Sequence, residues 1–173
     1  MSKLFFLSQV VSPAEGLFQN LAMTDFPIET KEKIQIIDIT DTVEKAMSSA
    51  GFVGGLVLVQ ILHTTARLWH NENEPLLHAD VVKLLSGMIP EGFKFGHDNF
   101  EIRKVNMCEG ECANGDSHFK AALFSASLLL QAWPENGKVR FHLGRWGRIL
   151  LVELDGPRPE RTVSVMMSGY FKK

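Results

Sequence analysis

The sequence predicts an α+β fold with a mostly antiparallel sheet. Segments rich in β-branched and aromatic residues outnumber the segments that show helical periodicity. Short turns separate many of these strand-like segments, and the clearest is Asn136-Gly137, a pair suited to the positive φ angles of a tight hairpin. Hairpin connections combined with few helices are typical of an α+β domain.

Local patterns along the chain define the individual elements. The expected strands are 26–30, 33–39, 56–62, 67–70, 128–133, 139–143, 149–154 and 162–167. A first helix is expected to begin at Thr40, a capping residue, and to end at Gly51. A second helix opens at Pro75 and ends near Gly87, and a short third helix covers 117–125.

Length and composition are those of a single soluble domain. The first part of the 173-residue chain lacks clear periodicity, so we expect an N-terminal extension at 1–25 and one domain at 26–173. The net charge of −2 argues against nucleic acid and against an acidic membrane as partners. Apolar stretches fall well short of the ~20 residues that span a bilayer. With only two cysteines, a reducing, cytoplasmic location is expected.

The most informative segment is the apolar run 56–62, which ends abruptly at His63, Thr64 and Thr65. A strand of this kind should be buried on at least one face, and its end is a rigid place from which to present an imidazole and two hydroxyls. Packing does not require these residue types at that position. This strand end is therefore the first candidate for chemistry.

Two further histidines, His97 and His118, share with His63 a polar and non-periodic setting. Neutral imidazole is the commonest protein ligand for zinc and similar ions, and a catalytic metal site typically uses three protein ligands. A shared metal site is one interpretation. The alternative is three separate surface histidines, which spacing alone favours because no short ligand motif links the positions.

Carboxylates close to these segments are candidates for a general base or for orienting a ligand. We consider Glu72, which follows the His63 strand closely together with Asn71, and Asp80. Glu74 is better explained as part of a helix start, since an acid ahead of Pro75 suits the helix macrodipole.

Residues 90–115 form a segment rich in Gly, Asn, Asp and Glu, and a loop of that length is usually functional or disordered. The segment holds Cys108 and Cys112, whose spacing falls within the gap of zinc-binding pairs. No second cysteine pair accompanies them. An oxidisable local thiol pair is therefore favoured over a structural zinc.

Arginines gather in the last third of the chain, and a guanidinium binds phosphate bidentately. Arg158, which follows Asp155-Gly156-Pro157, is the candidate for an anion. Ordinary solvation at a strand edge better explains Arg145 and Arg161. The sequence contains neither a Walker loop nor a dinucleotide fingerprint.

The order of these motifs resembles the YjbQ-like family, which is often labelled secondary thiamine-phosphate synthase. The matching positions, spread over roughly 26–170, are Asp38-Ile39-Thr40, Gly55-Leu56-Val57, His63-Thr64-Thr65-Ala66, Asn71-Glu72, Asp80, Pro90, His97-Asp98, 114–118, Ser127, Leu143-Gly144, Trp146 and 153–158. The His-Thr-Thr-Ala motif alone is a weak signal. The ordered set, with Asp-Gly-Pro-Arg near its end, is specific.

The resemblance implies a compact α+β fold that assembles as a homotrimer with pockets near subunit boundaries. It also implies that His63, His97 and His118 converge on a divalent metal, zinc or magnesium, or on a bound anion. The implied reaction joins a hydroxymethylpyrimidine diphosphate to a thiazole phosphate and releases diphosphate. Such a reaction would need neutralisation of the departing anion by a cation and by arginine.

Roles for further residues follow from the same resemblance. The substrate-binding residues are expected to be Thr64, Thr65, Asn71, Ser127 and Arg158. Glu72 or Asp80 would serve as the base or would orient a metal ligand. Arg158 would clamp phosphate or else brace the turn through Asp155.

The chain departs from the family pattern at several positions. Gly147 stands where Gln is usual after the Trp, and Phe95 stands where Tyr is usual before the His. Residues 1–25, the two cysteines and much of 91–113 also lie outside the pattern. Two other functions therefore stay open: a non-catalytic trimer that binds a phosphorylated metabolite or a metal, and a metal-assisted hydrolase. A purely structural role for the histidines ranks last.

Overall fold

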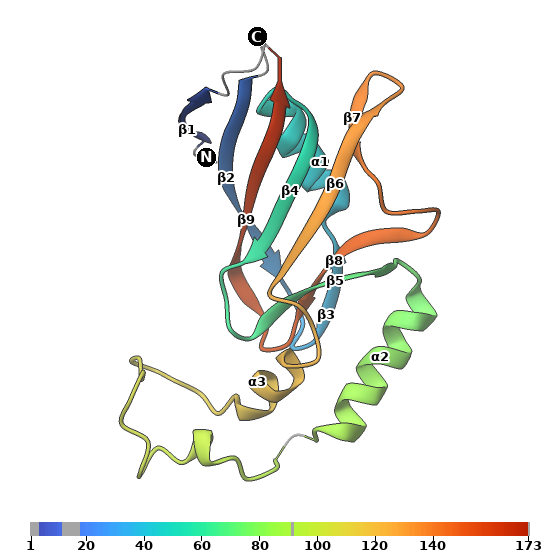
Figure 1. The fold of residues 1–173 in the computed structure, drawn as a ribbon. Helices are drawn as coiled ribbons and strands as arrows, with labels where there is room; N and C mark the ends of the chain where they lie inside the picture. Colours follow the sequence, from blue (N-terminus) through green and yellow to red (C-terminus); the bar gives the residue numbers. More distant parts are fainter. Residues whose placement is uncertain (1–3, 12–17, 91, 173) are drawn as a thin grey trace.

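A computed structural model describes the backbone of residues 4–11, 18–90 and 92–172, and the side chains from residue 20 onward within those ranges. Two antiparallel sheets form the fold (Figure 1). The six-stranded sheet has the order β1-β2-β9-β4-β6-β7, with bounds β1 Leu4–Val11, β2 Phe18–Thr30, β9 Arg158–Phe171, β4 Phe52–Ile61, β6 Ser127–Glu135 and β7 Lys138–Phe141. The three-stranded sheet has the order β3-β8-β5, with bounds β3 Gln35–Asp38, β8 Gly147–Glu153 and β5 Ala66–Glu72. The predicted α+β class with a mostly antiparallel sheet is confirmed.

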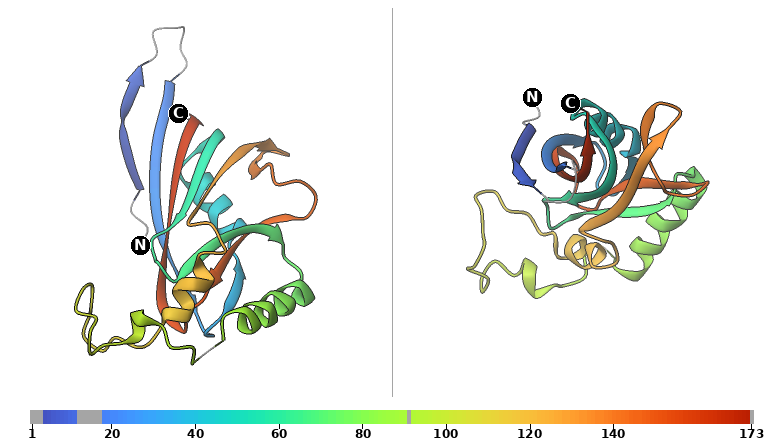
Figure 2. Two further views of the ribbon diagram at one scale, coloured as in Figure 1. Left: turned by 60° about the horizontal axis from the view of Figure 1, so that its bottom comes forward. Right: turned by 45° about the horizontal axis from the view of Figure 1, so that its top comes forward.

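Three α-helices and one 3₁₀ turn complete the described structure: α1 Thr40–Ser49, α2 Pro75–Met88, η1 Gly96–Asp98 and α3 Gly115–Ala121. The large sheet curls around α1, and the small sheet closes one end of it, with α2, α3 and η1 beyond (Figures 1 and 2). Among the described residues, no helix is long and apolar enough to cross a membrane. Within the described part of the loop predicted at 90–115, η1 is the one helical element before α3 begins at Gly115.

The predicted hairpin at Asn136-Gly137 is present between β6 and β7. Asn136 has φ 49° and Gly137 has φ 77°, as the tight turn requires. The strand predicted at 26–30 begins earlier than expected. β2 starts at Phe18 and pairs continuously with β9 from Asn20 to Ile28. The absence of clear periodicity over 18–25 hid this strand, because β2 lies between two other strands and its pattern is set by both.

α1 begins at Thr40 as predicted, but the predicted capping role of Thr40 is wrong. Its hydroxyl accepts the Ile149 amide at 2.8 Å, which ties the helix to β8. Asp38 Oδ1 instead accepts the Thr40 amide at 2.9 Å. The helix start is thus stabilised locally by Asp38, whereas the Thr40 hydroxyl is engaged by a strand that is distant in sequence.

The main core lies between the concave face of the large sheet, α1 and one face of the small sheet. It includes Val43 and Met47 from α1, Val57 from β4, and Ile149 and Leu151 from β8. The opposite face of the small sheet packs against α2 and α3 through a second cluster that contains Leu85, Ala121, Val152 and Leu154. Because apolar layers cover both faces of β8, the central residues 149–152 of this strand are all fully buried.

The large sheet can curl because two glycines face each other across β4 and β9. Gly55 pairs with Gly169, and both have positive φ angles, 144° and 159°. A Cβ on Gly55 would lie 2.3 Å from the Ser168 carbonyl oxygen, and one on Gly169 would lie 2.2 Å from that of Gly54. The two backbones therefore approach too closely for any side chain at either position.

Antiparallel pairing brings the ends of three strands to the start of β9. Thr30 at the end of β2 pairs with Arg158, and Ile61 at the end of β4 pairs with Val163. β8 reaches the same place directly through the turn at 155–157. Loops that leave these strands therefore emerge together at one end of the molecule, beside α3 (Figure 1).

A buried ion pair holds this junction together. Glu153 at the end of β8 is fully buried and accepts Arg161 Nε and Nη2, both at 2.6 Å. It also accepts the Thr30 hydroxyl at 2.8 Å and the Asp155 amide at 2.8 Å. Burial alone would raise the pKa of Glu153, but the Arg161 guanidinium and the other donors hold this pKa below its ordinary value of 4.5. The pair connects the small sheet to the large one.

We expect Glu153→Gln to lower the free energy of unfolding by about 3–5 kcal/mol, because the Arg161 guanidinium would stay buried without its counter-charge. Asp41→Asn is the matched control. It removes an exposed partner of Arg148 and should change the free energy by less than about 1 kcal/mol. Urea unfolding followed by circular dichroism measures both variants, and equal effects would contradict the role assigned to Glu153.

The same pair predicts a pH dependence. A carboxyl whose pKa is depressed by folding stabilises the protein above its ordinary pKa and loses that contribution as the pH falls through the folded-state value. The stability gap between wild type and Glu153→Gln should therefore be full at neutral pH and should narrow below about pH 4.5. A gap that stays constant down to the acid transition would be incompatible with a depressed pKa.

Candidate functional site

Asp155, in the turn after β8, is the centre of a polar cluster at the strand junction. Its Oδ2 accepts Arg158 Nη2 at 2.7 Å, Asn114 Nδ2 at 3.0 Å and the Thr65 hydroxyl at 3.4 Å. Arg158 Nε also donates to the Asp155 carbonyl oxygen at 2.8 Å. The Arg158 side chain is still 38% exposed. Its guanidinium is therefore fixed in orientation while part of it faces solvent.

His63 lies beside this cluster, directly after β4. Its Nε2 accepts the Thr162 backbone amide at 2.8 Å, so this nitrogen is unprotonated and the neutral ring carries its proton on Nδ1. Burial lowers the pKa of His63, and the nearby Arg161 guanidinium lowers it further. His63 is thus a neutral imidazole held in one tautomer.

His97 on η1 and His118 on α3 meet edge to face, with ring centroids 4.6 Å apart and an interplanar angle of 63°. Asp98 holds the two segments together, since its Oδ1 accepts the Asn114 and Gly115 amides at 3.0 and 2.9 Å. Burial lowers the pKa of His118, and the neighbouring His97 lowers it further. The structure therefore brings two of the three predicted histidines into direct contact.

Two buried polar atoms of this region, His97 Nε2 and Asn114 Oδ1, have no hydrogen-bond partner among the described residues. Unmatched buried polar groups are rare in folded proteins and are usually satisfied by water or by a ligand. One of these atoms lies on an imidazole and the other on the amide that bonds Asp155. The histidine pair and the Asp155 cluster thus each contain one buried polar atom that could bind water or a ligand.

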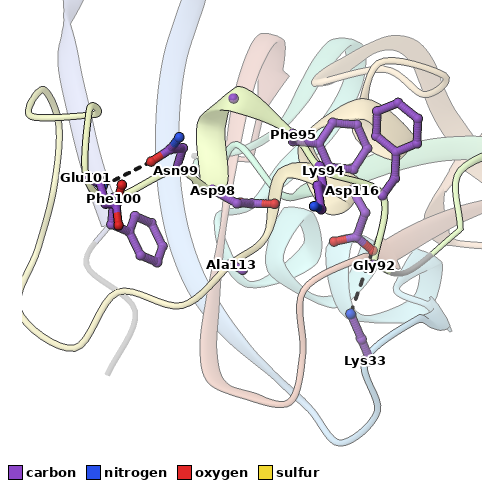
Figure 3. Close-up of a pocket in the computed structure, with 12 residues that line it drawn as sticks. Lys33, Gly92, Lys94, Phe95, Asp98, Asn99, Phe100, Glu101, Ala113 and Asp116 are labelled. Atoms are coloured by element: carbon purple, nitrogen blue, oxygen red, sulfur yellow. Dashed lines mark hydrogen bonds and ion pairs between the residues drawn. The ribbon is translucent and has the colours of Figure 1, made fainter.

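A hollow of about 1060 Å³ lies against the two segments that carry His97 and His118 (Figure 3). Its aromatic wall contains Phe93 and Phe95, with ring centroids 4.8 Å apart. Its opposite side includes Lys33, which is 3.7 Å from the Asp116 carboxylate. Neither His97 nor His118 lines this hollow. The hollow is therefore adjacent to the histidine pair and separate from it.

The other predicted site residues are distributed as follows. Thr65 is buried in the Asp155 cluster, whereas Thr64 and Ser127 are exposed. Asn71 and Glu72 stand at the far end of β5, about 20 Å from Ala66 at its near end, given ~3.3 Å of rise per strand residue. Asp80 is exposed on α2. Within one chain, Glu72 therefore does not reach the histidines, and in the described structure Asp80 forms no ion pair with any of them.

Two interpretations of charged residues can be compared directly with the structure. The helix-start role of Glu74 is confirmed, since its carboxylate accepts the Leu76 and Leu77 amides at 2.8 and 2.7 Å. Strand-edge solvation of Arg161 is wrong, because this side chain is buried against Glu153 and also donates to the Thr65 hydroxyl at 3.1 Å. Arg145 is exposed, with its guanidinium 4.9 Å from the centre of the Trp146 ring.

Sequence reasoning missed Glu153 and Asn114 as members of the cluster. Glu153 is the one acidic residue in the apolar run 149–154. That position in a strand expected to be buried was the signal that could have identified it. Asn114 lies in a polar loop that offers no such signal. Its role depends on α3 packing below the end of β8, where the Ser117 hydroxyl donates to the Leu154 carbonyl at 2.6 Å.

A metal does not fit the histidines as they stand. Across residues 4–11, 18–90 and 92–172, no group of three or more His, Cys, Asp or Glu side chains is placed to hold a metal ion. His63 has already committed its Nε2 lone pair to the Thr162 amide. Zinc or magnesium at His63, His97 and His118 stays a prediction.

The structure explains one departure from the family pattern. A Cβ on Gly147 would lie 2.2 Å from the Leu143 carbonyl oxygen and 2.4 Å from His70 Nε2. A glutamine could enter this position only if the chain at Leu143 moved away. The loop before β8 therefore leaves no room for a side chain at this position, which lies at the end of β8 opposite to Asp155.

Comparison with known proteins matches residues 24–170 to the family model described as UPF0047 protein YjbQ-like. A UPF0047 protein of Archaeoglobus fulgidus is 36% identical over 139 residues, which cover 80% of this chain and 96% of that protein. The UPF0047 protein YugU of Bacillus subtilis is 32% identical over 143 residues, covering 82% of this chain and 96% of YugU.

Solved structures agree with the sequence comparison. A hypothetical protein of Aeropyrum pernix K1 superposes with a TM-score of 0.68 at 33% identity, over 83% of this chain and 95% of the other. A YbjQ-like protein of unknown function from Sulfolobus solfataricus P2 has a TM-score of 0.70 at 25% identity, over 98% and 100% of the two chains. From the fold and these matches, the chain belongs to the YjbQ-like UPF0047 family.

Proposed function

We propose that the chain is an enzyme that acts on a phosphorylated small molecule at the cluster formed by Asp155, Arg158, His63 and His118. The observation that carries this proposal is the fixed orientation of the partly exposed Arg158 guanidinium. Two hydrogen bonds to Asp155 fix the guanidinium, which stays partly exposed. A preoriented guanidinium is suited to bind phosphate oxygens without losing further side-chain freedom.

Neutral imidazoles complete the proposed site. A neutral His63 can donate from Nδ1 while Thr162 holds its Nε2, and a neutral His118 can accept a proton near pH 7. Neither imidazole adds a positive charge that would trap a phosphate product. Arg158 therefore supplies the fixed charge and the histidines supply hydrogen bonds and proton transfer.

The candidate reaction is the one that the family label names: joining a hydroxymethylpyrimidine diphosphate to a thiazole phosphate. The thiazole nitrogen forms a bond to the pyrimidine methylene carbon while the carbon–oxygen bond to diphosphate breaks. The electron pair of the broken carbon–oxygen bond leaves with the diphosphate. Arg158 would stabilise the negative charge that develops on the departing oxygen. Thr64 is exposed at the same strand end, where its hydroxyl can contact the leaving group, whereas the buried Thr65 hydroxyl bonds Asp155 and Arg161 and would support the site from within.

We further propose that the protein assembles as a homotrimer, with the site near a subunit boundary. Large apolar side chains are exposed on two separate surfaces. On α2, Leu76, Leu84 and Met88 are 74%, 61% and 58% exposed, and on β6 Leu129 is 66% exposed. Contiguous exposed apolar groups are typical of surfaces that another chain covers.

The activity test compares Arg158→Gln, Arg158→Lys and the control Arg145→Gln in an assay of diphosphate release. Loss of one transition-state charge donor should lower the rate roughly 100-fold in Arg158→Gln. Lysine should restore part of the rate, because it keeps the charge but not the bidentate geometry. Arg145→Gln should match wild type, since Arg145 contacts the exposed Trp146.

An unchanged rate in Arg158→Gln would contradict the proposed role of Arg158. A wild-type protein that binds diphosphate without releasing it from the substrates would instead support the non-catalytic binding function. Running each assay with and without a chelator separates the predicted zinc or magnesium from the arginine, because only a metal-dependent reaction stops on chelation.

Light scattering coupled to gel filtration tests the assembly. The mass should equal three chains of 19.4 kDa. Leu84→Lys on α2 and Leu129→Lys on β6 should weaken whichever interface each side chain enters, because burying an unpaired charge is unfavourable. A wild-type protein that elutes as a monomer at micromolar concentration would rule out the trimer.

A further inference from the structure

The hollow beside η1 has an aromatic wall that stays open to solvent. The Phe93 ring lies 4.8 Å from the Phe95 ring, and Phe95 stacks on Phe119 of α3 at the same centroid distance with an interplanar angle of 23°. Phe93 and Phe119 are nevertheless 62% and 55% exposed. Phe100 also lines the hollow. Exposed aromatic rings beside a hollow of this size are suited to contact a planar ring of a ligand.

Close packing against α3 holds this wall in place. A Cβ on Gly115 would lie 2.7 Å from the Cβ of Phe95 and 2.9 Å from Asp98 Oδ2. Gly115 therefore allows Phe95 and η1 to approach the helix backbone more closely than any side chain would permit. Asp98 Oδ1 accepts the Gly115 amide at 2.9 Å from the same side. A ligand would thus meet a wall that is already formed, which lowers the cost of binding.

Positive charge gathers at one end of the hollow. Asp116 lines the hollow and accepts Lys120 Nζ at 2.7 Å, while Lys33 Nζ lies 3.7 Å from the same oxygen. Lys120 and Asp116 are both buried, whereas the Lys33 side chain is partly exposed. Lys94 lines the same end (Figure 3). Since Lys120 already neutralises Asp116, the charges of Lys33 and Lys94 are left to attract an anion.

Negative charge is distributed differently around the hollow. Glu101 lies at the end away from Lys33 (Figure 3). Asp98 lies between them, and its Oδ1 already accepts the Asn114 and Gly115 amides at 3.0 and 2.9 Å. The hollow is therefore asymmetric in charge. An anionic group should be attracted to the lysine end and repelled from the end that carries Glu101.

We propose that this hollow binds a planar aromatic anion, with the ring against Phe93 and Phe95 and the anionic group at Lys33 and Lys94. The site is separate from the Asp155 cluster. Ala113 lines the hollow, whereas the following residue donates its side-chain amide to Asp155. Among the described residues, no member of that cluster lines the hollow. The proposal therefore does not rest on the proposed function of Arg158.

Isothermal titration calorimetry of the full chain tests the class of ligand. The anionic probe 2-naphthoate should bind with a dissociation constant of about 1 mM or tighter. The neutral 2-naphthamide has nearly the same shape and should bind roughly tenfold more weakly, because it lacks the charge. Acetate lacks the ring and should also bind roughly tenfold more weakly. Equal binding of 2-naphthoate and 2-naphthamide, or no binding of 2-naphthoate, would overturn the proposal.

Charge and ring variants locate the probe. Lys33→Gln should weaken 2-naphthoate binding roughly three- to tenfold, because one charge is lost. Lys31→Gln is the matched control, since Lys31 is exposed in the same turn and does not line the hollow, and it should bind like wild type. Phe93→Ala should weaken binding roughly three- to tenfold through loss of the ring contact. Wild-type affinity in both Lys33→Gln and Phe93→Ala would contradict the assigned site.

A filled hollow gives a steric test. A Cβ on Gly96, which lines the hollow, meets no described atom within 4 Å, so Gly96→Trp can place its side chain there. This variant should weaken 2-naphthoate binding more than about tenfold. Gly87→Trp on α2 is the control, because a Cβ on Gly87 meets equally open space outside the hollow.

Arg158→Gln distinguishes the hollow from the Asp155 cluster. It should bind 2-naphthoate within about twofold of wild type, because Arg158 does not line the hollow and effects of separate sites are nearly additive. A large loss in Arg158→Gln with none in Lys33→Gln would place the probe at the Asp155 cluster and overturn the separate site.

Discussion

The buried pair of Glu153 and Arg161 fixes the strand junction at which the Asp155 cluster lies. Glu153 ends β8 in the small sheet, Arg161 belongs to β9 in the large sheet, and Thr30 joins them from β2. A buried carboxylate can remain ionised only if enough donors surround it, and here two guanidinium nitrogens, a hydroxyl and two backbone amides do so. The junction of the two sheets is therefore fixed by geometry that apolar packing alone would not specify.

The candidate site is connected to this junction by a continuous series of hydrogen bonds. Asp155 follows Glu153 closely in sequence, orients Arg158 and accepts a hydrogen bond from the Asn114 side-chain amide. Thr65 bonds both Asp155 and Arg161. His63 joins through the Thr162 amide on the same strand as Arg161. The structural ion pair and the partly exposed Arg158 therefore share hydrogen-bonding partners. A change in one is expected to reach the other through Thr65 and Asp155.

Local patterns predicted many of the individual elements and fewer of their contacts. The Asn136-Gly137 turn, the helix after Pro75 and the buried strand of 149–154 each have a signal within a few residues of sequence. The roles of Arg158 and Arg161 could not be separated in that way. Both stand on one strand, and only the pairing of β9 with β2 and β4 places Arg161 inside and Arg158 at the edge.

The histidines show the same limit. The family resemblance implied that three histidines would converge, and the structure brings His97 and His118 together while a backbone amide holds His63. Glu72 and Asp80 matched the order of motifs, yet strand length alone puts Glu72 far from the cluster within one chain. Motif order records which residues a family shares, whereas the distance between them depends on register and strand length.

The most direct test of the account is a proton NMR titration of His63 and His118, with and without inorganic diphosphate. Free protein should give midpoints below the ordinary value of 6.5 for both rings, because burial and nearby cations favour the neutral form. Bound diphosphate should raise both midpoints, since a neighbouring anion stabilises the protonated ring, and Arg158→Gln should abolish that rise. Midpoints at or above 6.5 that do not respond to diphosphate would contradict an anion site between Arg158 and neutral imidazoles.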